Sequence, residues 1–459
     1  MTNQHWKERD LAVLWHPCTQ MKDHEQLPMI PIRRGKGVWL EDFEGKQYLD
    51  AISSWWVNIF GHANPYINAA ISRQLSELEH VLLAGFTHEP VIRLSEKLVA
   101  VTPPGLQRCF FTDNGSSAVE AALKMSFHFW LNKEGFENPS AKKTKPKRTK
   151  FINLANSYHG ETLGALAVGD VSLYKNTYEP LLMQPITAAS PDSYHREAGE
   201  SAADYAVRQF AVMETILEEH AGEVCAVIVE PLVQVAGNVR MYDAVYLEML
   251  RAACDRHDVH LIADEIAVGF GRTGTMFACE QAGISPDFMC LSKGLTGGYL
   301  PLATVLTTDE VYQAFYDDYE KLTAFLHSHS YTGNALGCSA ALATLELFEQ
   351  RDVIKDNQAL AKQMADSVAE LAGHSHVSEV RQCGMIVAME MVKNKAGKVS
   401  YPWQERRGLQ VYKHSLSKGV LLRPLGNVVY FMPPYVINEE EIKLMASVAR
   451  EGIDLATRD

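Results

Sequence analysis

Two side chains suited to hold one cofactor, Asp264 and Lys293, each follow a short apolar run of the kind that forms a buried strand. A lysine at the end of such a strand is costly, because an unpaired ammonium loses its hydration there. The cost is removed if the amine forms a Schiff base, in which it gives up its charge. Pyridoxal 5'-phosphate binds through such a lysine and needs a carboxylate to keep its ring nitrogen protonated. We therefore expect Asp264 and Lys293 to bind this cofactor and to be catalytic.

The sequence around these two residues resembles the class-III pyridoxal-phosphate aminotransferases. The similarity lies in Asp-Glu-Ile-x-x-Gly-Phe-Gly-Arg-x-Gly, which begins at Asp264, and in Asp-x-x-x-x-Ser-Lys-Gly, which contains Lys293. A structural aspartate and a solvated lysine would be the ordinary interpretation of either residue alone, but not of the whole pattern. The resemblance implies a ping-pong transamination on an α/β fold of fold type I. Such a fold has a large domain with a mostly parallel central sheet and a smaller α+β domain.

Two further segments could complete the cofactor site. Segment 113–117 opens a helix with small residues, which let backbone amides surround a phosphate at the positive end of the helix dipole. Ordinary N-capping is the alternative for this segment, but the resemblance implies that Gly115 and Ser116 bind the cofactor phosphate. Tyr158 follows another apolar run and could stack on a pyridine ring or simply fill the core. The resemblance implies that Tyr158 lies over the cofactor and beside the substrate, as a catalytic residue.

A loop at 328–330 and the acidic residue Glu230 are less certain parts of the site. Glu230 ends an apolar run, where it belongs either to the active site or to a structural salt bridge. Ser328, His329 and Ser330 resemble the loop whose hydroxyl reaches the cofactor phosphate of the neighbouring subunit. The resemblance implies that His329 and Ser330 bind cofactor, that Ser328 contacts substrate, and that the protein is a homodimer with two sites at its interface.

Three segments indicate the substrate: Trp-His-Pro-Cys ending at Cys18, Ser-Ser-Trp-Trp containing Trp55, and an Arg-Pro segment that begins at Arg423. Tandem tryptophans usually pack in a core. Together, however, the segments resemble the members of the family that aminate 8-amino-7-oxononanoate in biotin biosynthesis. A long amino ketone needs apolar and aromatic walls, and its distant carboxylate needs an arginine. We therefore expect Trp55 to form a wall, Arg423 to bind the carboxylate and Cys18 to lie near the amino donor.

The sequence leaves alternatives for both the amino donor and the exact reaction. The resemblance implies S-adenosylmethionine as donor, but Cys18 stands where a tyrosine is common and Glu161 where an aspartate is common. Lysine is therefore a second candidate donor. Another ω-amino-acid or diamine aminotransferase would share every cofactor residue, although Trp55 and Arg423 argue against one. A cofactor-binding protein without catalysis is a third interpretation, against which the intact Lys293 argues.

The elements that must position these residues alternate between strand and helix. Apolar runs that predict strands lie at 109–112, 151–154, 224–229, 259–263, 288–291 and 303–306, with helix-period stretches at 116–131 and 242–257. This alternation predicts a mostly parallel sheet covered by helices on both faces. A helix is expected at 338–350, and the segments 384–390, 419–423 and 428–431 predict an antiparallel end.

This pattern divides the chain into three parts. We expect an N-terminal segment, 1–60, that joins the small domain and the active site, a large cofactor-binding domain at 61–335, and a small C-terminal domain at 336–459.

The composition excludes several function classes. Of 459 residues, 47% are hydrophobic and 22% charged, as in a soluble enzyme, and the net charge of −13 argues against a nucleic-acid partner. No apolar run matches a membrane span and the start lacks a signal-peptide core, so we expect no membrane partner and a cytoplasmic location. Eight cysteines without a Cys-x-x-Cys pair argue against zinc and disulfides, so no metal is expected. The basic run 142–150 is expected to be a solvated surface loop.

Overall fold

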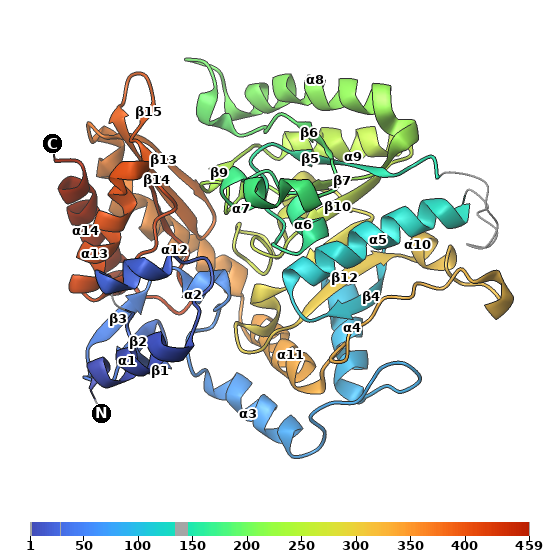
Figure 1. Ribbon diagram of the computed structural model, residues 1–459, viewed down its shortest axis with the longest axis horizontal. Coiled ribbons are helices and arrows are strands. Elements are labelled where there is room, and N and C mark those ends of the chain that lie inside the picture. The colour runs from blue at the N-terminus through green and yellow to red at the C-terminus, as the bar shows by residue number, and fades with distance from the viewer. Residues whose placement is uncertain (1, 28, 134–145, 459) are drawn as a thin grey trace. The chain divides into compact units, whose positions relative to one another are not determined.

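The computed structural model describes residues 2–27, 29–133 and 146–458 (Figure 1). The chain forms two compact units: a terminal unit of Met1–Pro65 with Asp356–Asp459, and a middle unit of Tyr66–Lys355. The second boundary falls later than the expected position 336. The reason is that helix α11 (Ala335–Gln350) packs against α4 (Glu89–Val101) within the middle unit.

The middle unit is built on a seven-stranded sheet of order β4-β12-β11-β10-β7-β5-β6. Its strands are β4 (Leu106–Thr112), β5 (Lys150–Leu154), β6 (Ile186–Ala188), β7 (Val224–Val229), β10 (His260–Asp264), β11 (Phe288–Leu291) and β12 (Ala303–Thr308). Only β12 runs against its neighbours, β11 and β4, while the other paired strands are parallel. The mostly parallel sheet is therefore confirmed, with β6 as a short strand that the sequence did not predict.

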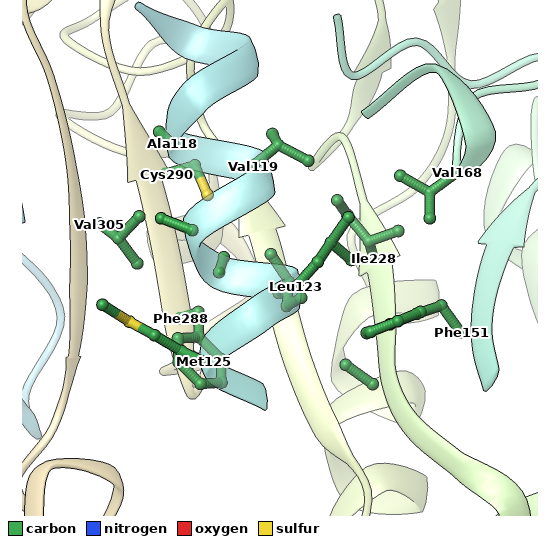
Figure 2. Close-up of a cluster of buried hydrophobic side chains, with 14 of the residues drawn as sticks. Ala118, Val119, Leu123, Met125, Phe151, Val168, Ile228, Phe288, Cys290 and Val305 are labelled. Carbon is green, nitrogen blue, oxygen red and sulfur yellow. The ribbon is translucent and has the colours of Figure 1, made fainter. Parts of the chain in front are cut away.

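The centre of this sheet is apolar because both of its faces are covered. Every residue of β7, β10 and β11 is buried, as expected for parallel strands between layers of helices. Figure 2 shows side chains of α5 (Gly115–Lys133), among them Ala118, Leu123 and Met125, in one buried cluster with side chains of the strands, among them Ile228, Phe288 and Cys290. This packing places the start of α5 above the end of the sheet where β10 delivers Asp264.

The remaining helices of the middle unit include the two predicted from periodicity. The helices expected at 242–257 and 338–350 are α9 (Val245–His257) and α11, and α8 (Ala202–His220) packs against α9. The shorter elements are α6 (Leu163–Ala167), α7 (Ser172–Lys175), α10 (Asp309–Gln313) and the hairpin β8 (Val233–Gln234) with β9 (Arg240–Met241), while α3 (Pro65–Leu75) leads into the unit.

The terminal unit contains two small sheets. The first has the order β1-β2-β3-β16, formed by β1 (Ile32–Lys36), β2 (Trp39–Asp42), β3 (Gln47–Asp50) and β16 (Val420–Leu421). The second is antiparallel and consists of β13 (Val377–Cys383), β14 (Ile386–Asn394), β15 (Val399–Ser400) and β17 (Val428–Phe431). The helices of this unit are α1 (Asn3–Val13), α2 (Ser53–Trp56), α12 (Val353–Val368), α13 (Arg407–Ser417) and α14 (Glu439–Ala456).

The prediction that segment 419–423 belongs to an antiparallel sheet is wrong. It was expected in the antiparallel end of the chain, but its strand β16 pairs in parallel with β3, with Val420 opposite Leu49 and Leu421 opposite Asp50. Two paired residues are too few to carry a strand pattern of their own. The pairing explains why the N-terminal segment and the C-terminal part of the chain form one unit (Figure 1).

Two features outside the sheets concern membrane spans and the basic run 142–150. No helix in the described ranges combines the length and apolar character needed to cross a membrane. Of the basic run, residues 142–145 lie outside the described residues. Arg148 is not simply solvated, because its guanidinium lies 3.8 Å from the centre of the Trp130 ring and donates to the Val224 carbonyl over 3.1 Å.

Candidate active site

Three polar side chains follow three neighbouring strands at one edge of the middle unit's sheet. Glu230 follows β7, Asp264 ends β10, and Lys293 comes just after β11. The register places Val229 opposite Ala263 and Asp264 opposite Cys290. Because these strands are parallel, their carboxyl ends meet at the same edge, where ligands bind in open α/β sheets. The sequence-predicted pair Asp264 and Lys293 is therefore brought together, and Glu230 lies with it.

Asp264 is held by a histidine that the sequence analysis did not single out. The Nδ1 of His159 lies 2.7 Å from Oδ2 of Asp264, and the Ile266 amide donates to Oδ1 over 3.1 Å. A carboxylate can only accept, so Nδ1 carries the hydrogen. Both side chains are buried, and His159 Nε2 has no hydrogen-bond partner among the described residues. A fixed, buried carboxylate of this kind suits the protonated ring nitrogen of the expected cofactor. The sequence signal that could have indicated His159 is its position between the aromatic Tyr158 and Gly160.

Lys293 opens a short helical turn with a left-handed backbone, φ +45°. Burial lowers the pKa of its ammonium, and the negative charges of Asp264 and Glu230 oppose this effect. A lowered pKa makes the neutral, nucleophilic amine more accessible. The environment of Lys293 therefore fits a lysine that binds a carbonyl cofactor.

Glu230 is buried and accepts hydrogen bonds from two backbone amides, those of Tyr158 at 2.9 Å and Val235 at 3.1 Å. Burial raises its pKa to about 8, and the negative charge of Asp264 acts in the same direction. Among the described residues, no basic side chain forms a salt bridge with it. The salt-bridge alternative is therefore wrong, and Glu230 instead fixes the backbone of the Tyr158 loop beside Asp264 and Lys293.

The Tyr158 loop packs directly against the start of α5. The Tyr158 hydroxyl donates to Glu161 over 3.0 Å, and the Glu161 amide donates to the Ser116 hydroxyl over 3.2 Å. Gly160 has φ +122°, and a Cβ at this position would overlap the Ser116 side chain. A Cβ on Gly115 would come within 2.9 Å of Ile266. Glycine is thus required at both positions for the loop, the helix start and the end of β10 to meet.

The start of α5 keeps the features needed for a phosphate site. Asn114 caps the helix, because its side-chain oxygen accepts from the Ser117 amide over 3.0 Å. Asn114 therefore supplies the N-cap, and Ser116 is not needed for it. The Gly115 and Ser116 amides lie in the first turn, where the helix dipole favours an anion. The residues of this edge thus fit a pyridine ring with a carbonyl and a phosphate group.

The loop 328–330 forms hydrogen bonds with other residues of the middle unit. His80 Nε2 lies 2.6 Å from the Ser330 carbonyl oxygen, and the His329 amide donates to Thr332. Ser328 and Ser330 are exposed, and His329 Nε2 is buried with no partner in the described part of the chain. In those same residues, no hydrogen bond joins the loop to Asp264 or Lys293. The placement of Ser328, His329 and Ser330 at a cofactor site therefore stays a prediction.

In the terminal unit, Arg423 stacks on Trp55. The guanidinium carbon lies 4.8 Å from the centre of the indole ring, and Trp55 is 37% exposed. Among the described residues, no carboxylate lies within salt-bridge distance of Arg423. Arg423 could thus bind a carboxylate from outside the chain. It would do so beside the accessible aromatic face of Trp55. Cys18, the third residue expected near the substrate, is also exposed.

In the part of the chain that the structure describes, no group of three or more histidine, cysteine, aspartate or glutamate side chains is arranged to hold a metal ion. Asp264 and His159 instead bond to each other.

Known proteins resemble this chain along nearly its whole length. The family model for class-III aminotransferases matches residues 19–450. A Helicobacter pylori protein named adenosylmethionine-8-amino-7-oxononanoate aminotransferase is 48% identical over 449 residues, 97% of each chain. The crystal structure of a protein with this name from Methanocaldococcus jannaschii is 38% identical, has a TM-score of 0.91 and covers 99% of each chain. The omega transaminase from Pseudomonas jessenii in complex with PMP is 29% identical, with a TM-score of 0.91 over 98% of each chain.

Proposed function

The chain belongs to the class-III aminotransferases, and from this premise we propose that it transfers an amino group from S-adenosylmethionine to 8-amino-7-oxononanoate. The product is 7,8-diaminononanoate, and the reaction is a step of biotin biosynthesis. One observation carries the proposal beyond the family: Arg423 stacks on the accessible indole of Trp55. A carboxylate at the end of an apolar chain requires such a pair. The name of the Helicobacter pylori relative, which is 48% identical, supports the same donor and acceptor.

The cofactor is pyridoxal 5'-phosphate, which when bound supplies an electron-withdrawing ring that stabilises negative charge at the substrate carbon. Asp264 holds the proton on the ring nitrogen, and His159 fixes the Asp264 carboxylate for this task. Lys293 binds the cofactor through its amine. The same Nζ of Lys293 would serve as the base that moves the proton at the carbon that carries the amino group. The lowered pKa of Lys293 keeps its amine suited to both tasks.

Tyr158 faces the substrate side of this arrangement. Its backbone is fixed by Glu230 and its hydroxyl by Glu161, at 2.9 and 3.0 Å. A ring held at both ends can stack on the cofactor without moving when substrates exchange. Glu161 accepts from Tyr158 and also offers negative charge to an amino donor.

The phosphate end of the cofactor is bound by Gly115 and Ser116 together with a second copy of the chain. In the proposed homodimer, His329 and Ser330 of one subunit complete the phosphate site of the other, and Ser328 lies beside its substrate. The exposure of Ser330 supports this role, as do the exposed aromatic side chains of Tyr316, Tyr319 and Tyr331 in the same part of the chain.

The location we propose is the cytoplasm. All eight cysteines are free thiols, and five of them are buried. Free buried thiols suit a reducing compartment, in which disulfides do not persist. The substrates of the proposed reaction are small molecules, and neither nucleic acid nor a membrane takes part in it.

The test is an assay of 8-amino-7-oxononanoate amination with a panel of donors: S-adenosylmethionine, lysine, diamines and ω-amino acids. We expect 7,8-diaminononanoate to form with S-adenosylmethionine. A second candidate, an ω-amino-acid or diamine aminotransferase, is favoured by the likeness to the Pseudomonas jessenii omega transaminase. Amination of simple ketones from these donors, without conversion of 8-amino-7-oxononanoate, would replace the proposed function by this second one.

A further inference from the structure

The helix α2 (Ser53–Trp56) is a left-handed turn made without glycine. Its four residues have positive φ values of 52°, 46°, 72° and 74° in chain order. Each is disfavoured, because the Cβ of an L-residue approaches the following carbonyl oxygen in this conformation. Such a backbone persists only where its surroundings determine it, and it often belongs to a binding site.

The surroundings that determine this turn centre on Asp50, the last residue of β3. Asp50 is fully buried, and its Oδ1 accepts from the amides of Ile52 at 3.3 Å and Ser54 at 2.9 Å. Its Oδ2 accepts from the Ser54 hydroxyl at 2.7 Å and from His62 Nε2 at 3.0 Å. A single carboxylate thus bonds both the entry and the middle of the turn.

The third residue that bonds to Asp50, His62, is itself held by its backbone. Its backbone forms two hydrogen bonds with Gly37, of 2.7 and 3.1 Å. A Cβ on Gly35 would come within 2.7 Å of the His62 Cβ, so the histidine packs directly on the backbone of β1. Asp50 is therefore bonded to a side chain that cannot shift easily.

A second anchor holds the far side of the turn. The Ser53 hydroxyl donates to the Met432 carbonyl over 2.7 Å, and Trp56 Nε1 donates to the Tyr430 hydroxyl over 3.0 Å. Trp56 is consequently buried, whereas its neighbour Trp55 keeps 37% of its surface exposed. The turn therefore directs the Trp56 indole into the core and leaves the Trp55 indole accessible.

The sheet explains why Arg423 meets Trp55. The strands β3 and β16 are parallel, with Asp50 opposite Leu421. The chain therefore leaves both strands at the same edge, toward the turn on one side and toward Arg423 on the other. The 4.8 Å stack of Arg423 on Trp55 follows from this pairing together with the left-handed turn.

We infer that Asp50 is a positioning residue for substrate recognition, which acts by holding the left-handed turn that places Trp55 under Arg423. The link to the amino-ketone carboxylate rests on the proposed function. The link to the position of Trp55 does not, because it rests on the hydrogen bonds of Asp50 alone. The Asp50 side chain is too buried to touch the ligand itself.

The position of Trp55 can be read without any substrate. The holoenzyme labelled with 5-fluorotryptophan gives fluorine NMR signals from its seven tryptophans, and Trp55→Phe identifies the signal of Trp55. Asp50→Asn keeps the size of the side chain but replaces the acceptor Oδ2 by a donor. We expect it to shift or broaden the Trp55 signal. Glycine adopts positive φ freely, so Asp50→Asn combined with Ser54→Gly should move the signal back toward that of the unaltered enzyme.

Asp42 provides a matched control in the same sheet. It is buried and also accepts four hydrogen bonds, from Asn3, Glu44, Lys46 and Tyr48. It lies at the opposite end of the β2–β3 hairpin from Asp50. Asp42→Asn should lower thermal stability but leave the Trp55 signal in place.

Kinetics then tests the functional half of the inference. Asp50→Asn should raise KM for 8-amino-7-oxononanoate about tenfold, with a smaller change in KM for the donor and recovery in the Ser54→Gly combination. An unchanged Trp55 signal in Asp50→Asn, or an equal shift in Asp42→Asn, would overturn the inference. So would a shifted signal with an unchanged acceptor KM. If the unaltered enzyme does not convert 8-amino-7-oxononanoate, the proposed function fails, and the fluorine signals still decide whether Asp50 positions Trp55.

Discussion

His159 Nδ1 lies 2.7 Å from Oδ2 of Asp264, and both side chains are buried. The histidine comes from the loop after β5 and the aspartate is the last residue of β10, so the bond joins a loop to a strand end across the intervening strand β7. A carboxylate held in this way keeps its orientation toward a cofactor ring.

This relationship predicts the effect of His159→Leu. Loss of the hydrogen bond should free the Asp264 carboxylate and weaken pyridoxal 5'-phosphate binding by about 1.5–3 kcal/mol, the range for hydrogen bonds to charged groups. Fluorescence titration of the cofactor-free protein measures this affinity. His260→Leu is the control, because His260 is buried at the other end of β10 and bonds to Ser126. Equal losses in both variants would show that His159 acts only through stability.

Lys293 should carry the cofactor covalently. Borohydride reduction of the holoenzyme should leave the cofactor attached to the peptide that contains Lys293, as established by mass spectrometry. Lys293→Ala should retain no label and should lose turnover. Label on another lysine, or turnover by the variant, would remove Lys293 from its proposed role.

Arg423→Ala should separate the two half-reactions. Removal of one partner of a charge pair costs about 2–5 kcal/mol, so the acceptor should bind far more weakly while the donor half-reaction stays nearly intact. Stopped-flow absorbance of each half-reaction gives the comparison. Arg208→Ala is a suitable control, because Arg208 also lies over an aromatic ring, that of Tyr205, at 4.9 Å. Equal losses in both half-reactions of Arg423→Ala would mark the arginine as structural.

Glu230 should make the stability of the cofactor-free protein depend on pH. Its pKa rises from 4.5 to about 8 on folding, chiefly because of burial. Between these values the folded state keeps a proton that the unfolded state releases, so this group's stabilisation is lost as pH rises. Glu230→Gln should therefore show a smaller fall in the free energy of unfolding from about pH 5 to about pH 8. Urea unfolding of both proteins across this range checks the sign, and parallel curves would contradict the assignment.

Cys18→Tyr should change donor affinity more than acceptor affinity. Cys18 is exposed and, as we propose, lies near the donor, whose sulfonium gains about 0.5–2 kcal/mol from aromatic faces. The absorbance change on mixing with S-adenosylmethionine or lysine, without ketone, measures each donor separately. Reaction with lysine but not with S-adenosylmethionine would reverse the donor assignment and leave the other residue roles untouched.

The centre of the fold could be predicted because its strands carry a strong local signal. The apolar runs before Glu230, Asp264 and Lys293 are buried on both faces, and each is followed by a polar residue at the functional edge. The helices at 116–131, 242–257 and 338–350 are likewise present as α5, α9 and α11, with boundaries displaced by a few residues. The spacing of apolar residues along a long helix or strand can be recognised in the sequence without knowledge of the elements that pack against it.

The features that escaped prediction depend on contacts between distant residues. The parallel pairing of β16 with β3 involves two residue pairs, and nothing local indicates it. The hydrogen bond of His159 to Asp264 joins a loop to the end of a distant strand. The left-handed turn at Ser53–Trp56 uses serine and tryptophan, neither of which favours positive φ by itself. Its conformation depends on the hydrogen bonds that Ser53 and Ser54 form with the distant Met432 and with Asp50.

The pairing of β3 with β16 also has a consequence for biosynthesis. The strand β3 is synthesised early. Its partner strand β16 begins at Val420 and is synthesised only after the whole middle unit. Tyr66–Lys355 is contiguous and can fold while synthesis continues, whereas β3 waits with an open edge, the kind of edge on which chains aggregate. A chain that stops before Val420 therefore contains the residues proposed to hold the cofactor but lacks Arg423 and Met432, whose carbonyl bonds to the turn. Quality control during translation should act on that exposed N-terminal hairpin.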